Sequence, residues 1–157
     1  MPTEYHFTTI WEFQASLEQT WKVVTDLKQY PRTWSDFPSV QLLAGDGEEV
    51  GSVWECQTRG SLPYTLTYQL EVLEVDRPQS LRTRATGDLV GVGRWAFEDM
   101  GGGRTRATYS WDVATTRPVL NLVAPLFKGL MARNHDAVME RGYRALRPLV
   151  EGVPTPS

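Results

Sequence analysis

The residue best suited to proton transfer is His135, which follows Asn134 in an apolar segment near the C-terminus. An imidazole titrates near neutral pH, so a histidine that faces a cavity can hydrogen-bond a ligand carbonyl or act as a general acid or base. A lone histidine on an apolar face can also be a core residue whose nitrogens are satisfied within the protein. No pattern marks a nucleophile beside it, so acyl transfer has no support. We treat His135 as the one candidate catalytic residue and as a candidate ligand contact.

Metal and cofactor chemistry find little support in the sequence. The other histidine, His6, lies far away in the first predicted strand, and the common spacing of two histidines on one helix is absent. Cys56 is the single cysteine, which excludes an intrachain disulfide and a zinc site built on several cysteines. We therefore expect no metal and no cofactor, and the low cysteine count favours a reducing, cytoplasmic location.

Aromatic side chains form the second candidate group, because six Trp and six Tyr are a heavy load for 157 residues. Such rings can simply fill the core, but their indole and phenol groups need hydrogen-bond partners when buried, which suits them to orienting a ligand. Trp34 lies in a loop at the expected pocket mouth, and Asn121 can be a ligand contact or a surface or capping residue. The predicted ligand-binding residues are Trp34, Trp54, Cys56, Leu66, Tyr68, Trp95, Tyr109, Trp111, Asn121, Met131, Asn134, His135 and Val138.

The elements that must position these side chains follow from the hydrophobic periodicity. Apolar and polar residues alternate over 5–14, which predicts a half-buried strand. Ser16 and Gln19 form a capping box that predicts a helix start, and Pro31 fits the first turn of a second short helix. Turn signals then separate six strands, with a bulge expected after Val72. Five of these strands are predicted at 51–59, 64–75, 81–86, 90–98 and 104–115, and one precedes the turn at 44–47.

The last element is predicted to be a long helix from Pro118 to about Leu149. Pro125 lies inside this range and should kink the helix or divide a short leading helix from the main one. On the main helix, an apolar stripe runs from Met131 through His135 to Leu149.

This order of elements predicts an α+β domain. Consecutive strands joined by short turns form an antiparallel meander, and the C-terminal helix is the one element long enough to cover its apolar face. We predict a single domain over 1–151, in which a seven-stranded curved antiparallel sheet wraps around a long C-terminal helix, with two short helices after the first strand. Residues 152–157 are predicted to be a disordered tail. A strongly bent sheet cannot close tightly on one helix, so its unfilled end should be an apolar cavity.

Charge and hydropathy narrow the classes of partner. The net charge of −3 gives no reason to expect nucleic acid. Five arginines of the predicted outer sheet face are interleaved with acidic residues and are more typical of a solvated surface than of a nucleic-acid site. The most apolar stretch, 119–132, is too short to span a bilayer, so no stable membrane insertion is expected. The arginines are Arg82, Arg84, Arg94, Arg104 and Arg106.

The sequence resembles the SRPBCC superfamily of START-like and birch-pollen-allergen-like helix-grip proteins. The resemblance rests on the element order and on the segment Gly-Asp-Leu-Val-Gly-Val-Gly-Arg-Trp at 87–95. The polyketide cyclase/dehydrase-like branch is closer, through 111–113, through 116–118 followed by Asn121, and through 134–139 before Gly142. The resemblance covers about 5–150 and implies a helix-grip fold around a hydrophobic ligand. It does not fix an activity, because this superfamily contains both binding proteins and enzymes.

Three hypotheses on function follow. We expect a binding protein that sequesters or carries a small hydrophobic molecule, such as a lipid, a polyketide or another aromatic metabolite, in the cavity. The alternative is an aromatase/cyclase-type enzyme with His135 as general acid or base and Tyr68 or Tyr109 as a hydroxyl donor. In the third hypothesis, a partner protein is recognised through Trp34 and Phe37 at the pocket mouth. The sequence carries no signal for an oligomeric state.

Overall fold

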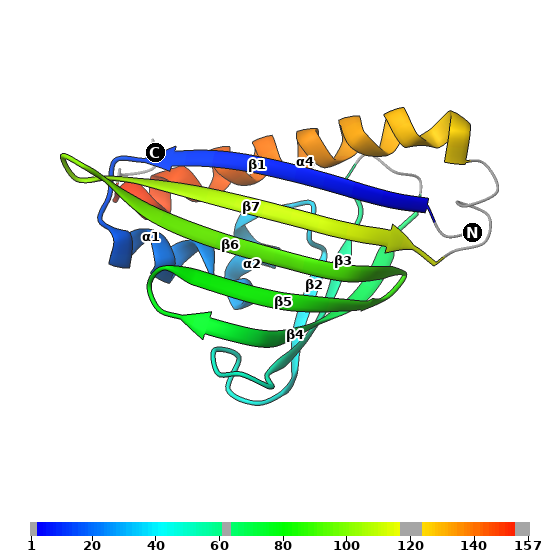
Figure 1. Cartoon of the computed structure of the whole chain (residues 1–157), viewed down its shortest axis with the longest axis horizontal. Helices are drawn as coiled ribbons and strands as arrows, with labels where there is room; N and C mark the ends of the chain where they lie inside the picture. Colours follow the sequence, from blue (N-terminus) through cyan, green and yellow to red (C-terminus); the bar gives the residue numbers. More distant parts are fainter. Residues whose placement is uncertain (1–2, 61–63, 117–123, 153–157) are drawn as a thin grey trace.

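A curved antiparallel sheet and one long helix dominate the structure, a computed structural model that describes residues 3–60, 64–116 and 124–152 (Figure 1). Within these ranges the sheet has seven strands in the order β1-β7-β6-β5-β4-β3-β2. The α+β helix-grip prediction is confirmed. The elements are β1 (Thr3–Phe13), α1 (Leu17–Val24), η1 (Leu27–Gln29), α2 (Tyr30–Thr33), β2 (Ser39–Ala44), β3 (Val53–Thr58), β4 (Leu66–Asp76), β5 (Ser80–Gly87), β6 (Leu89–Gly101), β7 (Arg104–Thr115) and α4 (Ala124–Glu151).

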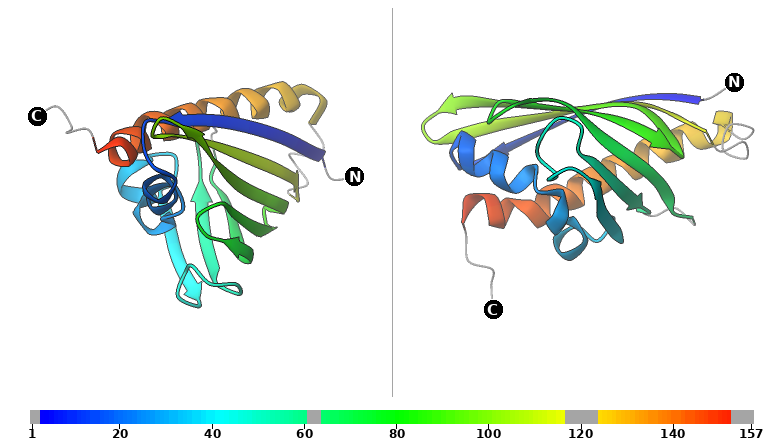
Figure 2. Two further views of the ribbon diagram at one scale, coloured as in Figure 1. Left: turned by 60° about the vertical axis from the view of Figure 1, so that its left-hand side comes forward. Right: turned by 90° about the horizontal axis from the view of Figure 1, so that it is seen from below.

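The sheet follows the predicted meander except that β1 returns to pair with β7. This pairing places Phe7 opposite Trp111 and Tyr5 opposite Val113, so that side chains from both ends of the chain share the inner face. The bulge expected after Val72 is confirmed by a shift in the β4–β5 register between Val72 and Glu74. Figure 2 shows that the bent sheet wraps round α4, with α1 and α2 beside the C-terminal part of that helix.

The two short helices start where the sequence places them. The Ser16 hydroxyl accepts a hydrogen bond from the Gln19 amide at 3.1 Å and so caps α1. Pro31 lies in the first turn of α2, where its missing N–H costs nothing. A 3-10 turn, η1, joins the two helices. Trp21 and Val24 are buried beneath α1, so this layer covers one end of the sheet.

The described part of the long helix begins at Ala124, so Pro125 is its second residue. The predicted start at Pro118 and any short helix leading up to Pro125 lie outside the described residues. At the other end Val150 is 1% exposed and Leu149 is 40% exposed, so the stripe predicted to reach Leu149 is one residue off there. The C-terminal half packs against α1 as well as the sheet. Every fourth residue from Val138 to Val150 is buried there.

The buried side chains form two clusters. The closed core lies beneath α1 and the C-terminal half of α4 and contains Phe13, Val24, Leu146 and Val150, each at most 1% exposed. The cavity end lies under the N-terminal half of α4 and includes Tyr68, Trp111 and Met131. The predicted tail lies outside the described residues from 153 onward. No helix in the described ranges combines the length and apolar character needed to cross a bilayer.

Candidate ligand-binding cavity

A cavity of about 130 Å³ lies between the concave face of the sheet, α4 and the α1–α2 layer. Residues of both core clusters line it, so the cavity lies at the boundary between the closed core and the cavity end. Ten of the thirteen predicted ligand-binding residues line it. They are Trp34, Leu66, Tyr68, Trp95, Tyr109, Trp111, Met131, Asn134, His135 and Val138.

Three predicted residues are not placed in this wall. Trp54 packs beside the β2–β3 turn, where its indole donates a hydrogen bond of 3.1 Å to the Gly47 carbonyl. Cys56 has the expected inward parity but is fully covered, and burial raises the pKa of its thiol to about 12. Both belong to the buried cluster at the cavity end, and neither lines the open space. Asn121 lies outside the described residues.

Sequence reasoning missed more than half of the wall. The β1 contribution was accessible, because Tyr5 and Phe7 share the parity of Trp11, which is buried. The residues from α1, η1 and α2 carried only a weak signal, since short apolar helix faces do not show what they cover. Phe37, expected at the pocket mouth as part of a partner-binding surface, also lines the wall. The missed residues are Tyr5, Phe7, Val24, Thr25, Leu27, Tyr30, Thr58, Leu70, Leu81, Thr83, Leu89, Gly93, Val113 and Met139.

His135 reaches the cavity wall from α4 and stacks on Phe7 of β1, with ring centroids 4.0 Å apart and planes 11° apart. The side chain is 13% exposed, and its Nδ1 lies 3.9 Å from the Asp136 carboxylate, which is too far for a hydrogen bond. This Nδ1 is buried and has no hydrogen-bond partner among the residues that the structure describes. Burial lowers the pKa of His135 to about 4, against a smaller opposing effect of Asp136, so the ring is neutral at pH 7.

Two tyrosine hydroxyls in the cavity wall differ in their hydrogen bonding. The Tyr68 hydroxyl pairs with the Thr58 hydroxyl at 2.6 Å. The Tyr109 ring packs on Trp95 and Trp111, with centroids at 4.6 and 5.8 Å, and its hydroxyl makes no hydrogen bond within the described ranges. Burial raises the pKa of both phenols far above the ordinary range, so both are neutral donors.

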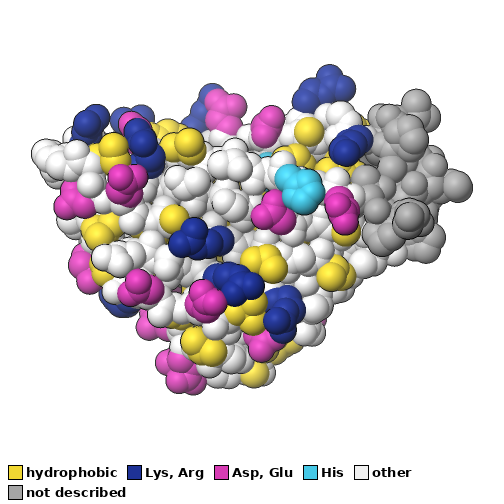
Figure 3. All heavy atoms as spheres, in the orientation of Figure 1, with side chains coloured by type: hydrophobic (Ala, Val, Ile, Leu, Met, Phe, Trp, Pro, Cys, Tyr) yellow, Lys and Arg dark blue, Asp and Glu magenta, His cyan; other side chains and the backbone are white. Residues whose placement is uncertain are grey.

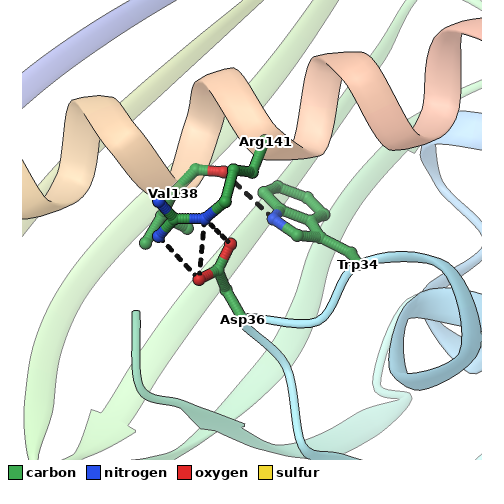
Figure 4. Close-up of polar contacts among 4 residues, drawn as sticks. All are labelled: Trp34, Asp36, Val138 and Arg141. Carbon is green, nitrogen blue, oxygen red and sulfur yellow. Dashed lines mark hydrogen bonds and ion pairs between the residues drawn. The ribbon is translucent and has the colours of Figure 1, made fainter. Parts of the chain in front are cut away.

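The loop between α2 and β2 is fastened to α4 across the cavity (Figure 4). The Trp34 indole donates to the Val138 carbonyl at 3.0 Å, and the Arg141 guanidinium donates to both Asp36 carboxylate oxygens at 2.8 to 3.2 Å. Asp36 is 6% exposed, and these bonds raise the pKa of Arg141. Because Trp34 and Phe37 line the cavity, this clamp holds one of its walls in place.

Glycines allow two close approaches at the wall. A β-carbon on Gly142 would collide with the Trp34 ring, so glycine on α4 makes room for the clamp. A β-carbon on Gly93 would lie 2.7 Å from the Tyr109 hydroxyl and 2.8 Å from the Trp111 ring. Gly93 belongs to the glycine-rich β6 segment and thereby sets the depth of the cavity.

The chemistry of the wall is apolar and uncharged. Among the residues that the structure describes, none that lines the cavity is Asp, Glu, Lys or Arg, and the one histidine in the described wall is neutral at pH 7. Charged residues lie outside, where Figure 3 shows arginines beside acidic side chains on the outer face. There Arg82 pairs with Glu74 at 2.9 Å and Arg106 with Glu12 at 2.9 Å. Among the described residues, no group of His, Cys, Asp and Glu could hold a metal ion.

The curved sheet gripping one helix and the internal cavity define the START-like, helix-grip class of proteins. The chain belongs to the family described as polyketide cyclase/dehydrase and lipid transport, whose model matches residues 5–151. The predicted resemblance is thereby confirmed. None of the curated proteins matches the chain.

Solved structures with the same fold share little sequence with the chain. TTHA0849 from Thermus thermophilus is 18% identical with a TM-score of 0.75, over 96% of this chain and 100% of its own. The Zhui aromatase/cyclase from Streptomyces sp. R1128 is 15% identical with a TM-score of 0.73, over 98% and 100%. A START superfamily protein from Mycobacterium smegmatis is 17% identical with a TM-score of 0.66, over 88% and 97%. At these identities the likeness establishes the fold.

Proposed function

We propose that the protein binds a small hydrophobic molecule in the cavity and sequesters or carries it. The observation that supports this most directly is the wall of aromatic and aliphatic side chains, in which none of the described residues is charged. Such a space gains free energy when it removes apolar ligand surface from water, by about 25 cal/mol per Å². The family, described as including lipid transport, favours the same interpretation. The ten predicted residues in the wall are proposed as ligand contacts.

A neutral fluorescent probe tests this proposal. N-phenyl-α-naphthylamine should bind the protein with enhanced emission and should be displaced by molecules retained from lipid or polyphenol extracts in native mass spectrometry. In Val113→Phe, a larger side chain enters the cavity from β7, and we expect the affinity to fall about tenfold or more. Val92→Phe places the same change on the opposite face of β6 and should bind as the wild type does. Absence of probe binding and of any retained ligand would refute the proposal.

A cyclase-type enzyme is the second candidate, because His135 and the hydroxyls of Tyr68 and Tyr109 line one cavity. Such a protein would fold a reactive carbonyl chain while His135 transfers a proton during aldol closure or dehydration. The lowered pKa weakens this candidate, since at pH 7 only about one ring in a thousand is protonated and a base of pKa about 4 is weak.

Turnover separates the two candidates. If the enzyme hypothesis holds, the protein should accelerate the closure of a tri-β-ketone followed by absorbance, and His135→Phe should abolish the acceleration. His6→Phe, on the exposed outer face, is the matched control. Binding of the tri-β-ketone without acceleration supports the carrier hypothesis.

We further propose that the protein has no nucleic-acid partner and that it is cytoplasmic. We expect no nucleic-acid partner, because arginines of the outer face such as Arg84 lie beside acidic residues, here Glu71 at 3.6 Å. An electrophoretic shift assay with duplex DNA at low salt should show no complex. A cytoplasmic location, proposed from the single cysteine, is tested by fractionation of the native cell.

A further inference from the structure

Eight polar side chains of the described cavity wall can be divided into two sets by their hydrogen bonding. In the first set, each group is hydrogen-bonded within the protein: Tyr68 to Thr58, Tyr30 to the Val24 carbonyl, and Trp34 to the Val138 carbonyl. These groups hold the wall together and leave little for a ligand. Thr25 and Thr83 belong to the same set, since their hydroxyls donate to the carbonyls of Trp21 at 2.7 Å and Gly93 at 3.5 Å.

The second set makes no hydrogen bond to any residue in the described ranges. It contains the Tyr109 hydroxyl on β7 and the imidazole of His135 on α4, whose Nδ1 is buried without a hydrogen-bond partner. Both are fixed by ring contacts, Tyr109 by Trp95 and Trp111 and His135 by Phe7, so their orientation is set before a ligand arrives. Unpaired polar groups in an apolar space are costly, and a ligand that satisfies them recovers this cost.

We propose that the cavity selects an uncharged aromatic ligand that carries a hydroxyl group, which His135 and Tyr109 recognise through hydrogen bonds, and that it rejects an aromatic carboxylate with the same ring system. This rests on the proposed function and adds the charge state and the polar group of the ligand. A hydroxyl both donates and accepts, so it satisfies a phenol and either nitrogen of a neutral imidazole. An ionised carboxylate would lose its hydration and meet no positive charge in the wall.

Three probes with one ring system test the selection at pH 7: β-naphthol, methyl β-naphthyl ether and β-naphthoate. We expect wild-type protein to bind β-naphthol about tenfold more tightly than the ether, which cannot donate, and about a hundredfold more tightly than the anion. The readout is titration calorimetry, supported by quenching of tryptophan fluorescence.

Two variants distinguish the contribution of the hydrogen bonds to ligand selection from the contribution of the uncharged wall. His135→Phe keeps a ring on Phe7 and Tyr109→Phe removes one oxygen, so each should reduce the preference for β-naphthol over the ether at least threefold while β-naphthoate stays excluded. His6→Phe should leave all three affinities unchanged. Equal binding of β-naphthol and its ether, or equal or tighter binding of β-naphthoate, overturns the inference. The inference is also overturned if none of the three probes binds. In that case, binding of N-phenyl-α-naphthylamine would leave the proposed function standing, and its absence would refute the proposed function too.

Discussion

The two ends of α4 perform different tasks on the same sheet. The C-terminal half fills the closed core with Leu146 and Val150, which are 0% and 1% exposed. The N-terminal half presents Met131, Asn134 and His135 to the cavity. The difference arises from the second layer, because α1 contacts α4 and its buried residues Trp21 and Val24 belong to the same cluster as Leu146 and Val150. The closed core therefore carries stability, and the cavity end can carry unpaired polar groups.

The polar groups show the same contrast. In the closed core, Thr105 is 1% exposed and its hydroxyl donates to the Ala15 carbonyl at 2.8 Å. At the cavity end, His135 makes no hydrogen bond within the described ranges. Since satisfied buried groups are the rule in folded proteins, the exception at the cavity end is the place to look for a ligand.

Truncation of a large side chain at each end gives the largest expected effect. Leu146→Ala removes a fully covered side chain of the closed core and should lower the free energy of unfolding by about 3 kcal/mol. Met131 borders the cavity, so Met131→Ala should lower the free energy of unfolding by only about 1 to 2 kcal/mol. It should also change the affinity for N-phenyl-α-naphthylamine. Urea unfolding and probe titration measure both. Equal losses of stability would remove the distinction between the ends.

Acid should destabilise the cavity end through His135. The pKa is 6.5 for an ordinary histidine and about 4 in the folded protein. Between these values the unfolded chain takes up a proton that the folded protein does not, so stability is full above pH 6.5 and falls as the pH approaches 4. The loss should reach about 3 kcal/mol. The groups nearest the ring are the Asp136 carboxylate and uncharged Phe7.

His135→Phe isolates this contribution from the carboxylates that also titrate in acid. Unfolding free energies of both proteins, measured from pH 7 to pH 4, should diverge in favour of the variant as the pH falls. Parallel curves would show that the imidazole is hydrated in the folded protein.

The sequence allowed the sheet to be predicted better than the cavity. Period-two alternation assigned the inward face correctly, including Trp54 and Cys56, and Ile10, which breaks the alternation, is 59% exposed on the outer face. Parity says which side of a strand faces inward, but it does not say how far the facing helix lies. Cys56 is sealed and Tyr68 lines open space, although they are opposite each other in the β3–β4 register.

Contacts between distant segments were also beyond sequence reasoning. The Asp36–Arg141 pair spans 105 residues, and neither residue belongs to a motif that names its partner. The Phe7–His135 stack likewise joins the first strand to the last helix. His135 could be nominated from its type and its apolar surroundings, but its lowered pKa depends on a burial that only the folded chain creates.

Two glycines of the same helix test how closely the α2–β2 loop is fitted to α4. In Gly142→Ala the new methyl group would meet the Trp34 ring, which the bond to Val138 holds in place, so we expect a loss of about 1 to 3 kcal/mol. Gly129→Ala has no described residue within 4 Å and should stabilise the protein by up to about 1 kcal/mol through helix propensity. Thermal unfolding by circular dichroism measures both, and a neutral Gly142→Ala would mean that the loop is free to move.

Release of the clamp gives the smallest expected change in stability and the most specific change in kinetics. Asp36→Asn weakens the paired hydrogen bonds to Arg141, whose side chain is 40% exposed and can turn to water, so the cost should be about 1 kcal/mol. Glu140→Gln disrupts an exposed pair with Arg144 and is the control, with an expected change below about 0.5 kcal/mol. Because Trp34 and Phe37 line the cavity, only Asp36→Asn should speed dissociation of N-phenyl-α-naphthylamine in stopped-flow measurements. Unchanged dissociation would place the exit route elsewhere, away from this loop.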